Sequence, residues 1–147
     1  MTALPSEGYT GEPPEFPLSK VPVYDVYFED KKRVRELDDD ATRARWEREL
    51  ELWAWAWSTP QACAWSMERW RWHSVAMWVR TSALCETADA TAADKNSLHR
   101  FADQIGLTPA GLRENGWGIV ADEVATKRDA PAAPAPTRRL RAVDGSA

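Results

Sequence analysis

Two short basic clusters flank the run of three aspartates at residues 38–40. Lys and Arg side chains bind nucleic-acid phosphates, and arginine adds two-point hydrogen bonding. These clusters are therefore candidate DNA contacts of the folded region, but basic charge alone does not locate a DNA site, and the same pattern fits a solvated face of mutually paired charges. The residues are Lys31, Lys32, Arg33 and Arg35 before the aspartates, and Arg43 and Arg45 after them.

A third basic cluster, Arg138, Arg139 and Arg141, follows the Ala- and Pro-rich segment 130–136. Such a segment favours an extended polyproline conformation and acts as a tether. We predict that residues 129–147 form a disordered tail whose arginines contact either DNA or a protein partner.

No pattern in the chain predicts catalysis. Gly106 and Gly111 have the spacing of a phosphate-binding loop, but Leu112 and Arg113 stand where its Lys and its Ser or Thr would follow. The cysteines and histidines match no zinc-ligand spacing, and no hydrolase or metalloprotease motif is present. We expect no catalytic residue, no metal and no cofactor, so the chain is predicted not to be an enzyme.

The nine tryptophans are the unusual feature of the composition. On a helix, Trp55 points about 200° away from Trp53, so covering both rings requires contacts on two sides of the helix. Either a small core is overfilled and leaves some indoles exposed, or the second side meets another subunit, where aromatic residues are enriched. The residues assigned to such an interface are Trp55, Trp70 and Trp78.

Length and charge restrict the remaining possibilities. The 147 residues hold one modest domain, and the 44% hydrophobic and 29% charged residues are typical of a globular protein. A net charge of −4 means that any DNA contact must come from local clusters. Because no apolar run reaches membrane-spanning length and no signal-peptide pattern is visible, we expect a cytoplasmic protein.

The apolar spacing predicts an all-α fold. A helix is expected over 41–58, a second from Pro60 toward residue 85 with a bend near 70–74, a third after the capping pattern Thr91–Asp94, and a short last helix over 117–124. The segment 21–28 is β-prone but has no evident strand partner, so it is expected to be merely extended. The predicted organisation is a Pro-rich arm over 1–37, a helical oligomerisation domain over 38–128, and the tail.

Several segments, in order along residues 11–128, resemble the small terminase subunits of tailed phages, of the type that infects actinobacteria. They are Gly11–Leu18, Glu49–Trp57 with Ser58–Trp65, Val75–Arg80, and Gly106–Trp117 followed by Ala121–Val124. The Trp-bearing helix that meets Pro60-Gln61-Ala62 and the Asn-Gly-Trp end of the domain are the more specific parts of this resemblance.

The resemblance implies a homo-oligomer, commonly a ring, that acts in the host cytoplasm. Such a subunit recognises double-stranded phage DNA at the packaging start and delivers it to a separate large subunit with ATPase and nuclease activity. Two alternatives remain at this stage: a helical DNA-binding transcription regulator, and a head-assembly adaptor that does not bind DNA.

Overall fold

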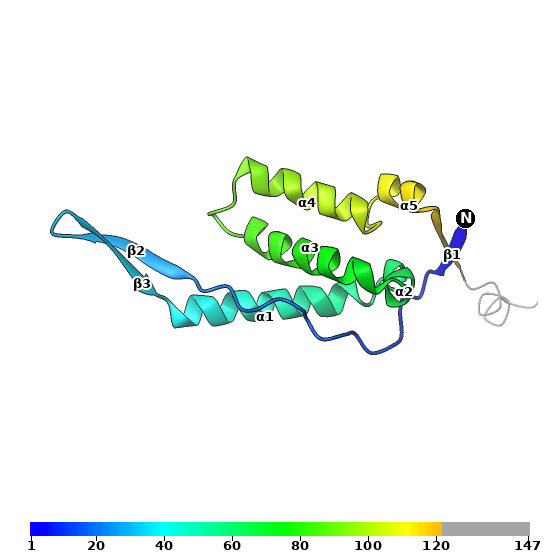
Figure 1. The fold of residues 1–147 in the computed structure, drawn as a ribbon, viewed down its shortest axis with the longest axis horizontal. Coiled ribbons are helices and arrows are strands. Elements are labelled where there is room, and N and C mark those ends of the chain that lie inside the picture. The colour runs from blue at the N-terminus through cyan, green and yellow to red at the C-terminus, as the bar shows by residue number, and fades with distance from the viewer. Residues whose placement is uncertain (122–147) are drawn as a thin grey trace, which may run out of the picture.

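The computed structural model describes residues 1–121, and its fold mixes helices with two small sheets (Figure 1). The predicted all-α class is therefore wrong. The helices are α1 (Asp39–Ala56), α2 (Pro60–Met67), the 3-10 turn η1 (Arg69–Arg71), α3 (Trp72–Cys85), α4 (Ala92–Gln104) and α5 (Pro109–Asn115). The strands are β1 (Thr2–Pro5), β2 (Tyr24–Glu29), β3 (Lys32–Leu37) and β4 (Trp117–Val120).

The helix starts follow the capping signals in the sequence. The Asp38 carboxylate accepts from the Ala41 amide at 2.9 Å, and Thr91 forms a reciprocal capping box with Asp94. Helix α2 begins at Pro60 as expected, but the Thr59 hydroxyl donates back to the Ala56 carbonyl at 2.7 Å and does not cap the helix.

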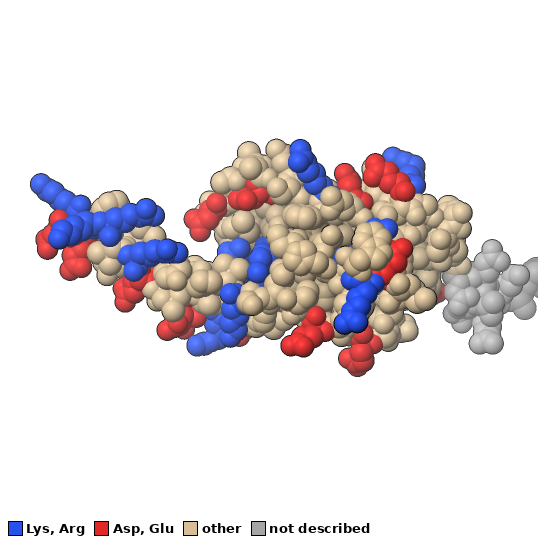
Figure 2. Space-filling model, viewed as in Figure 1, with Lys and Arg blue, Asp and Glu red and all other residues tan. Residues whose placement is uncertain are grey.

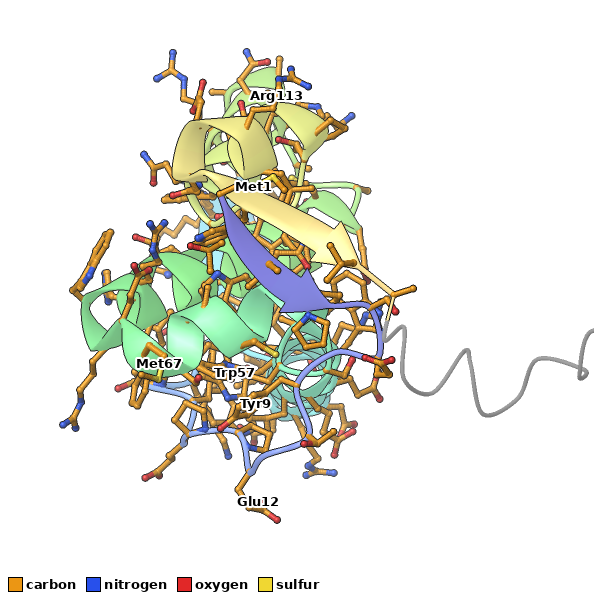
Figure 3. The ribbon with its side chains drawn as sticks, turned by 90° about the vertical axis from the view of Figure 1, so that its right-hand side faces the viewer. Met1, Tyr9, Glu12, Trp57, Met67 and Arg113 are labelled. Atoms are coloured by element: carbon orange, nitrogen blue, oxygen red, sulfur yellow. The ribbon has the colours of Figure 1, made fainter. Side chains whose placement is uncertain are left out.

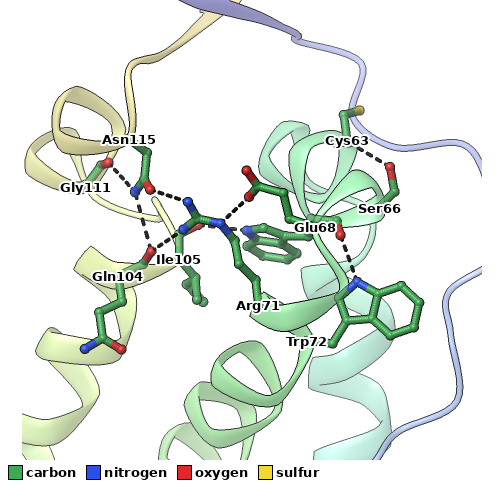
Figure 4. A network of polar contacts seen from close by, with 10 residues as sticks. Cys63, Ser66, Glu68, Arg71, Trp72, Gln104, Ile105, Gly111 and Asn115 are labelled. Atoms are coloured by element: carbon green, nitrogen blue, oxygen red, sulfur yellow. Dashed lines mark hydrogen bonds and ion pairs between the residues drawn. The ribbon is translucent and has the colours of Figure 1, made fainter.

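The expected bend in the second helix is a true break between α2 and α3. The backbone leaves helical geometry at Glu68, and η1 turns the chain into α3. Arg71 holds this corner (Figure 4): it pairs with Glu68 and donates to the Gln104 carbonyl at 2.8 Å and to Asn115 Oδ1 at 2.7 Å. One guanidinium thus ties the α2–α3 corner to the α4–α5 end of the molecule.

Helices α1, α3 and α4 lie side by side with α3 in the middle, where it contacts both neighbours (Figure 1). Its buried face carries Val75, Ala76, Val79 and Ala83. These positions recur at three- and four-residue steps, as expected for a helix packed along one stripe. The small alanines allow close approach, while the large rings gather toward the α2 end of the layer.

The N-terminal arm covers the tryptophan side of α1. Phe16 is buried and packs edge-on against Trp53, with 5.3 Å between ring centroids, and the Trp53 indole donates to the Pro14 carbonyl at 2.7 Å. Leu4 is buried as well. The arm is therefore part of the core of the same chain.

Strands β1 and β4 pair in parallel and join the two ends of the described chain, in register Thr2 with Trp117 (Figure 3). The short helix predicted over 117–124 is therefore wrong for 117–120, and residues 122–124 lie outside the described part. Gly116 ends α5 in a left-handed conformation, and the Thr2 amide then donates to its carbonyl at 2.7 Å. Residues 117–120 form a strand because they pair with a segment more than a hundred residues away in the sequence. Local periodicity does not reveal such a distant partner.

Strands β2 and β3 pair as an antiparallel hairpin, so the expectation of an unpaired extended segment at 21–28 is also wrong. The sequence pattern does not indicate the partner strand, residues 32–37, because this segment is highly charged and has few of the β-branched and aromatic residues typical of strands. Both faces of this hairpin are largely exposed, and β3 does not show the apolar alternation that marks a half-buried strand.

A buried ion pair links the arm, α1 and α3. The Glu49 carboxylate is completely buried and accepts from Arg80 Nε at 3.1 Å and from the terminal Arg80 nitrogen at 2.9 Å. Arg80 also donates to the Ser19 carbonyl and lies over the Phe16 ring. The charge of Glu49 is thereby compensated by a residue that also holds the arm in place.

Replacing Arg80 with methionine is expected to lower the free energy of unfolding by about 3–5 kcal/mol, because it leaves a buried carboxylate without its two-point partner. Chemical denaturation measures this loss. The matched control is Arg48→Met, which removes an exposed two-point pair with Glu86 and should cost less than about 1 kcal/mol. Equal losses in the two variants would contradict the central role of the buried pair.

Gly106→Ala should destabilise the protein more than Gly116→Ala. Both glycines have positive φ, +80° and +70°, so both variants incur a backbone cost of about 1–2 kcal/mol. Only at residue 106 would the new Cβ lie 2.4 Å from the buried Trp117 ring, whereas at 116 it meets nothing within 4 Å. Thermal unfolding should show an additional loss of about 1–3 kcal/mol for Gly106→Ala.

Candidate nucleic-acid interface

The β2–β3 hairpin projects from one end of the helical layer, away from the β1–β4 sheet at the other end (Figure 1). Its base is fixed to the start of α1, because the Asp38 amide donates to the Val23 carbonyl at 2.9 Å and the Val23 amide donates to the Thr42 hydroxyl at 2.9 Å. The hairpin therefore begins at an anchored point and ends in solvent.

The hairpin turn consists of Asp30 and Lys31, between the paired residues Glu29 and Lys32. Both turn residues have positive φ, 46° and 63°, as in the type I′ turn that matches the twist of a tight hairpin. The usual sequence signal for this turn is Asn-Gly or Asp-Gly. Asp-Lys does not carry that signal, which is why the sequence did not predict the hairpin.

The strand register separates the hairpin side chains into two chemically different faces. Residues paired across the ladder share a face, and successive residues alternate. We name the first face the arginine face: Tyr24, Val26, Phe28, Arg33, Arg35 and Leu37. The opposite one is the acidic face: Asp25, Tyr27, Glu29, Lys32, Val34 and Glu36.

The arginine face combines cations with apolar and aromatic groups and contains no carboxylate. The Arg35 guanidinium lies 3.7 Å from the centroid of the Tyr24 ring, and Arg33 is directly opposite Phe28. An open groove of about 490 Å³ runs along this face to the helical body. It is lined by Pro22, Val23, Tyr24, Val26, Arg33, Arg35, Arg45 and Asp89.

The acidic face has three carboxylates and one lysine, so it repels phosphates. The Tyr27 hydroxyl donates to Glu36 at 3.3 Å, and the negative charge of Glu36 raises the pKa of the Tyr27 phenol above its ordinary value. Figure 2 shows the same separation: basic side chains gather along the upper side of the hairpin and acidic side chains along the lower side.

The structure divides the six basic residues that the sequence grouped together. Arg33 and Arg35 share the arginine face, Lys31 lies in the turn, and Lys32 lies on the acidic face opposite Glu29.

The two arginines of α1 lie in different surroundings. Arg43 is exposed and 3.9 Å from Asp40. The side chain of Arg45 is only 17% exposed, and it lies 3.9 Å from Glu49. Arg45 lines the end of the groove, but its Nε is buried and has no hydrogen-bond partner among the described residues, so Arg33 and Arg35 are the better-placed phosphate ligands.

Tyr24 and Phe28 are binding candidates that the sequence prediction missed. Both are exposed and lie on the same face as the two arginines. The available signal was the aromatic, β-prone segment 24–29, followed after two residues by the charged segment 32–37 of equal length. A π-face beside a guanidinium favours stacking on planar groups such as bases.

The tail arginines 138, 139 and 141 lie outside the described residues. Residues up to Ala121 place the end of the described chain beside the β1–β4 sheet, at the opposite end of the molecule from the hairpin (Figure 1).

The three tryptophans assigned to an oligomer interface lie in different settings. Trp55 is 53% exposed and packs on Trp78, with 5.8 Å between ring centroids, and Trp70 is 71% exposed on η1 beside Arg71. The arm of the same chain covers Trp53, so that side of α1 needs no second subunit. Of the three tryptophans, Trp55 and Trp78 are neighbours. Trp70 has no ring contact with either of them among the described residues, so the fold does not bring all three together in one patch.

The residues that carry the terminase resemblance have structural roles. The Gln61 amide donates to the Gly106 carbonyl at 3.0 Å, and the Trp65 indole donates to the Ile105 carbonyl at 2.9 Å. Asn115 accepts from Arg71 and donates to the Gly111 carbonyl, and Trp117 packs over Gly106. These residues lock α2 onto the α4–α5 turn and lie away from the hairpin.

No helix within residues 1–121 is long and apolar enough to cross a membrane. In the same range, no three His, Cys, Asp or Glu side chains gather in a way that could hold a metal ion.

No protein-family model, curated protein or solved structure matches the chain. The chemistry of the hairpin is therefore the principal guide to function. A carboxylate-free face with two arginines and exposed aromatic rings suits a ligand that is anionic and offers planar groups for stacking.

Proposed function

We propose that this chain is a non-enzymatic DNA-binding adaptor that acts as the small subunit of a phage terminase and binds double-stranded DNA through the β2–β3 hairpin. The observation that carries the DNA-binding part is the arginine face, on which Arg33 and Arg35 stand beside exposed aromatic rings without a carboxylate. The terminase assignment is supported by the sequence resemblance over residues 11–128.

A projecting two-stranded ribbon is a suitable shape for this role, because the grooves of duplex DNA admit such ribbons. Arginine can contact phosphates or base edges through two parallel hydrogen bonds. The separation of charges between the hairpin faces also explains how a chain of net charge −4 can bind DNA. The acidic face is turned to the side opposite the arginines and away from the ligand.

Oligomerisation would multiply this contact. In a ring each subunit presents one hairpin, so a few arginines per subunit give a large combined affinity if several hairpins reach the same duplex. The hairpin and the exit of the described chain lie at opposite ends of the molecule (Figure 1). This arrangement suits an adaptor that binds DNA at one end, while the tail arginines Arg138, Arg139 and Arg141 engage the large ATPase-nuclease subunit in the host cytoplasm.

The double variant Arg33→Ala/Arg35→Ala should weaken binding to duplex DNA and reduce the steepness of its salt dependence. Each phosphate contact contributes about 0.9 to the slope of log affinity against log salt, so the loss of two contacts lowers the slope by about 1.8 for each hairpin that engages the duplex. Fluorescence anisotropy with a labelled duplex at several salt concentrations measures both quantities.

The matched control is Lys32→Ala/Arg43→Ala, which removes the same charge from the acidic face and from α1. This control should keep most of the affinity and slope. If it weakens binding as much as the first variant, the assignment to the arginine face is wrong. A third variant with alanine at 138, 139 and 141 should bind DNA normally but stimulate the large subunit's ATPase less.

The DNA used in the assay separates the proposed role from its rivals. A packaging-start duplex should bind more tightly than promoter fragments of the same length. The reverse order would favour a transcription regulator, and no salt-dependent binding to either duplex would leave a head-assembly adaptor.

Trp55→Ala should lower the fraction of oligomer in native mass spectrometry while changing thermal stability little, because its ring is half exposed. Trp53→Ala is the control: its ring is buried under the arm, and truncation should cost about 3–5 kcal/mol of stability. A wild-type protein that remains monomeric at micromolar concentration would contradict the proposed assembly.

A further inference from the structure

Phe28 is the most exposed aromatic residue in the described part of the protein, with a relative solvent exposure of 75%. It lies next to the end of β2, two residues before the Asp30–Lys31 turn. A large ring in this position is not required by the fold, since it packs into no core cluster. Together with Tyr24, Val26 and Leu37, which are also exposed and lie on the same face, Phe28 forms a contiguous apolar patch, and such patches mark binding surfaces.

The neighbours of Phe28 define the kind of ligand. Arg33 is its direct cross-strand partner, Val26 precedes it on the same face, and Lys31 follows in the turn. The nearest carboxylates are Glu29, which points to the opposite face because successive side chains alternate, and Asp30, which lies in the turn and not on the arginine face. The tip therefore presents an apolar ring between cations, which matches a stack of bases between two rows of phosphates.

The backbone of the hairpin holds this ring outward. The ladder pairs Phe28 with Arg33 and Glu29 with Lys32, and only the two turn residues connect the strands. The register at the tip is therefore fixed. Cross-strand pairing fixes the face on which the ring stands, so Phe28 cannot turn to the acidic face without breaking the register.

Resting on the proposed function, we infer that the hairpin tip is a DNA-bending wedge: Phe28 inserts between adjacent base pairs from the minor groove, while Lys31 and Arg33 bind the flanking phosphates. Apolar wedges of this kind partly unstack one step and kink the duplex toward the major groove. The kink opens the minor groove around the tip, and Arg35, further along the same face, then follows the groove wall. Flexible pyrimidine–purine steps are the preferred sites, since they unstack most easily.

The test uses the full-length protein and a short duplex with a central TA step and a fluorescent dye at each end. Wild-type protein should shorten the end-to-end distance, as measured by energy transfer, and should raise the fluorescence of a 2-aminopurine placed at that step. Phe28→Ala should bind about tenfold more weakly, a loss within the range for one stacked aromatic ring, and should leave the bound duplex straight. Phe28→Leu, which retains an apolar wedge, should restore much of the bend.

Tyr27→Ala is the matched control, because Tyr27 neighbours Phe28 but lies on the acidic face. It should bend DNA as the wild type does. Thermal unfolding of Phe28→Ala should match that of the wild type, because the ring is outside the core.

The alternative outcomes separate this inference from the proposed function. If wild-type protein binds the duplex with the expected salt dependence but leaves it straight, or if Phe28→Ala bends it equally, the wedge is refuted and the proposed function stands. If no salt-dependent DNA binding occurs at all, the proposed function itself fails. If Phe28→Ala dissociates the native oligomer while DNA bending persists, the ring contacts a second copy and the wedge is refuted.

Discussion

The structure depends on the burial of Trp57. This ring is almost completely enclosed, and the rings of Tyr9, Trp53, Trp65 and Trp72 surround it with centroid distances of 5.6 to 5.8 Å. These neighbours come from the arm, α1, α2 and α3, so one side chain joins four segments (Figure 3). Its indole nitrogen is buried without a hydrogen-bond partner among the described residues. Burial of a ring of this size contributes about 4–6 kcal/mol, which exceeds the cost of about 1–3 kcal/mol for the unsatisfied donor.

The requirement to enclose this cluster explains why the arm is extended and where it runs. The helices alone leave the Trp53 and Trp57 side of α1 open, and residues 9–16 close it. A polar anchor supplements the rings, because Arg80 satisfies the buried Glu49 and holds the arm through Ser19. The segment that leaves this enclosure then turns back as the β2–β3 hairpin. Core and hairpin are thus consecutive parts of one chain with different tasks.

This division affects how the terminase resemblance is interpreted. The more specific residues of the resemblance close the α2, α4 and α5 end through hydrogen bonds, and its segments in the arm, α1 and α3 supply residues of the core. The groups proposed to bind DNA lie on the hairpin, which is exposed on both faces and free of such constraints. Changes on the hairpin are therefore expected to alter the proposed DNA contact, while the α2, α4 and α5 end keeps the fold.

Several local features were determined by the sequence itself. The helix starts near residue 41, at Pro60 and after Thr91 were predictable, because start signals depend on residues within three or four positions. The basic character of residues 31–35 was also evident, and so was the need to cover tryptophans on more than one side of α1.

Only the tertiary structure decided which of these residues act together. The parallel pairing of β1 with β4 joins segments at opposite ends of the described chain, and a local pattern carries no record of so distant a partner. The hairpin lacked the usual turn residues, and its second strand lacked an apolar alternation because neither face of the hairpin is buried. Its register then placed Arg33 and Arg35 with Phe28 and turned Lys32 to the other side. Linear spacing shows that charges are close along the chain, but the face each one occupies depends on strand pairing, which is a three-dimensional property.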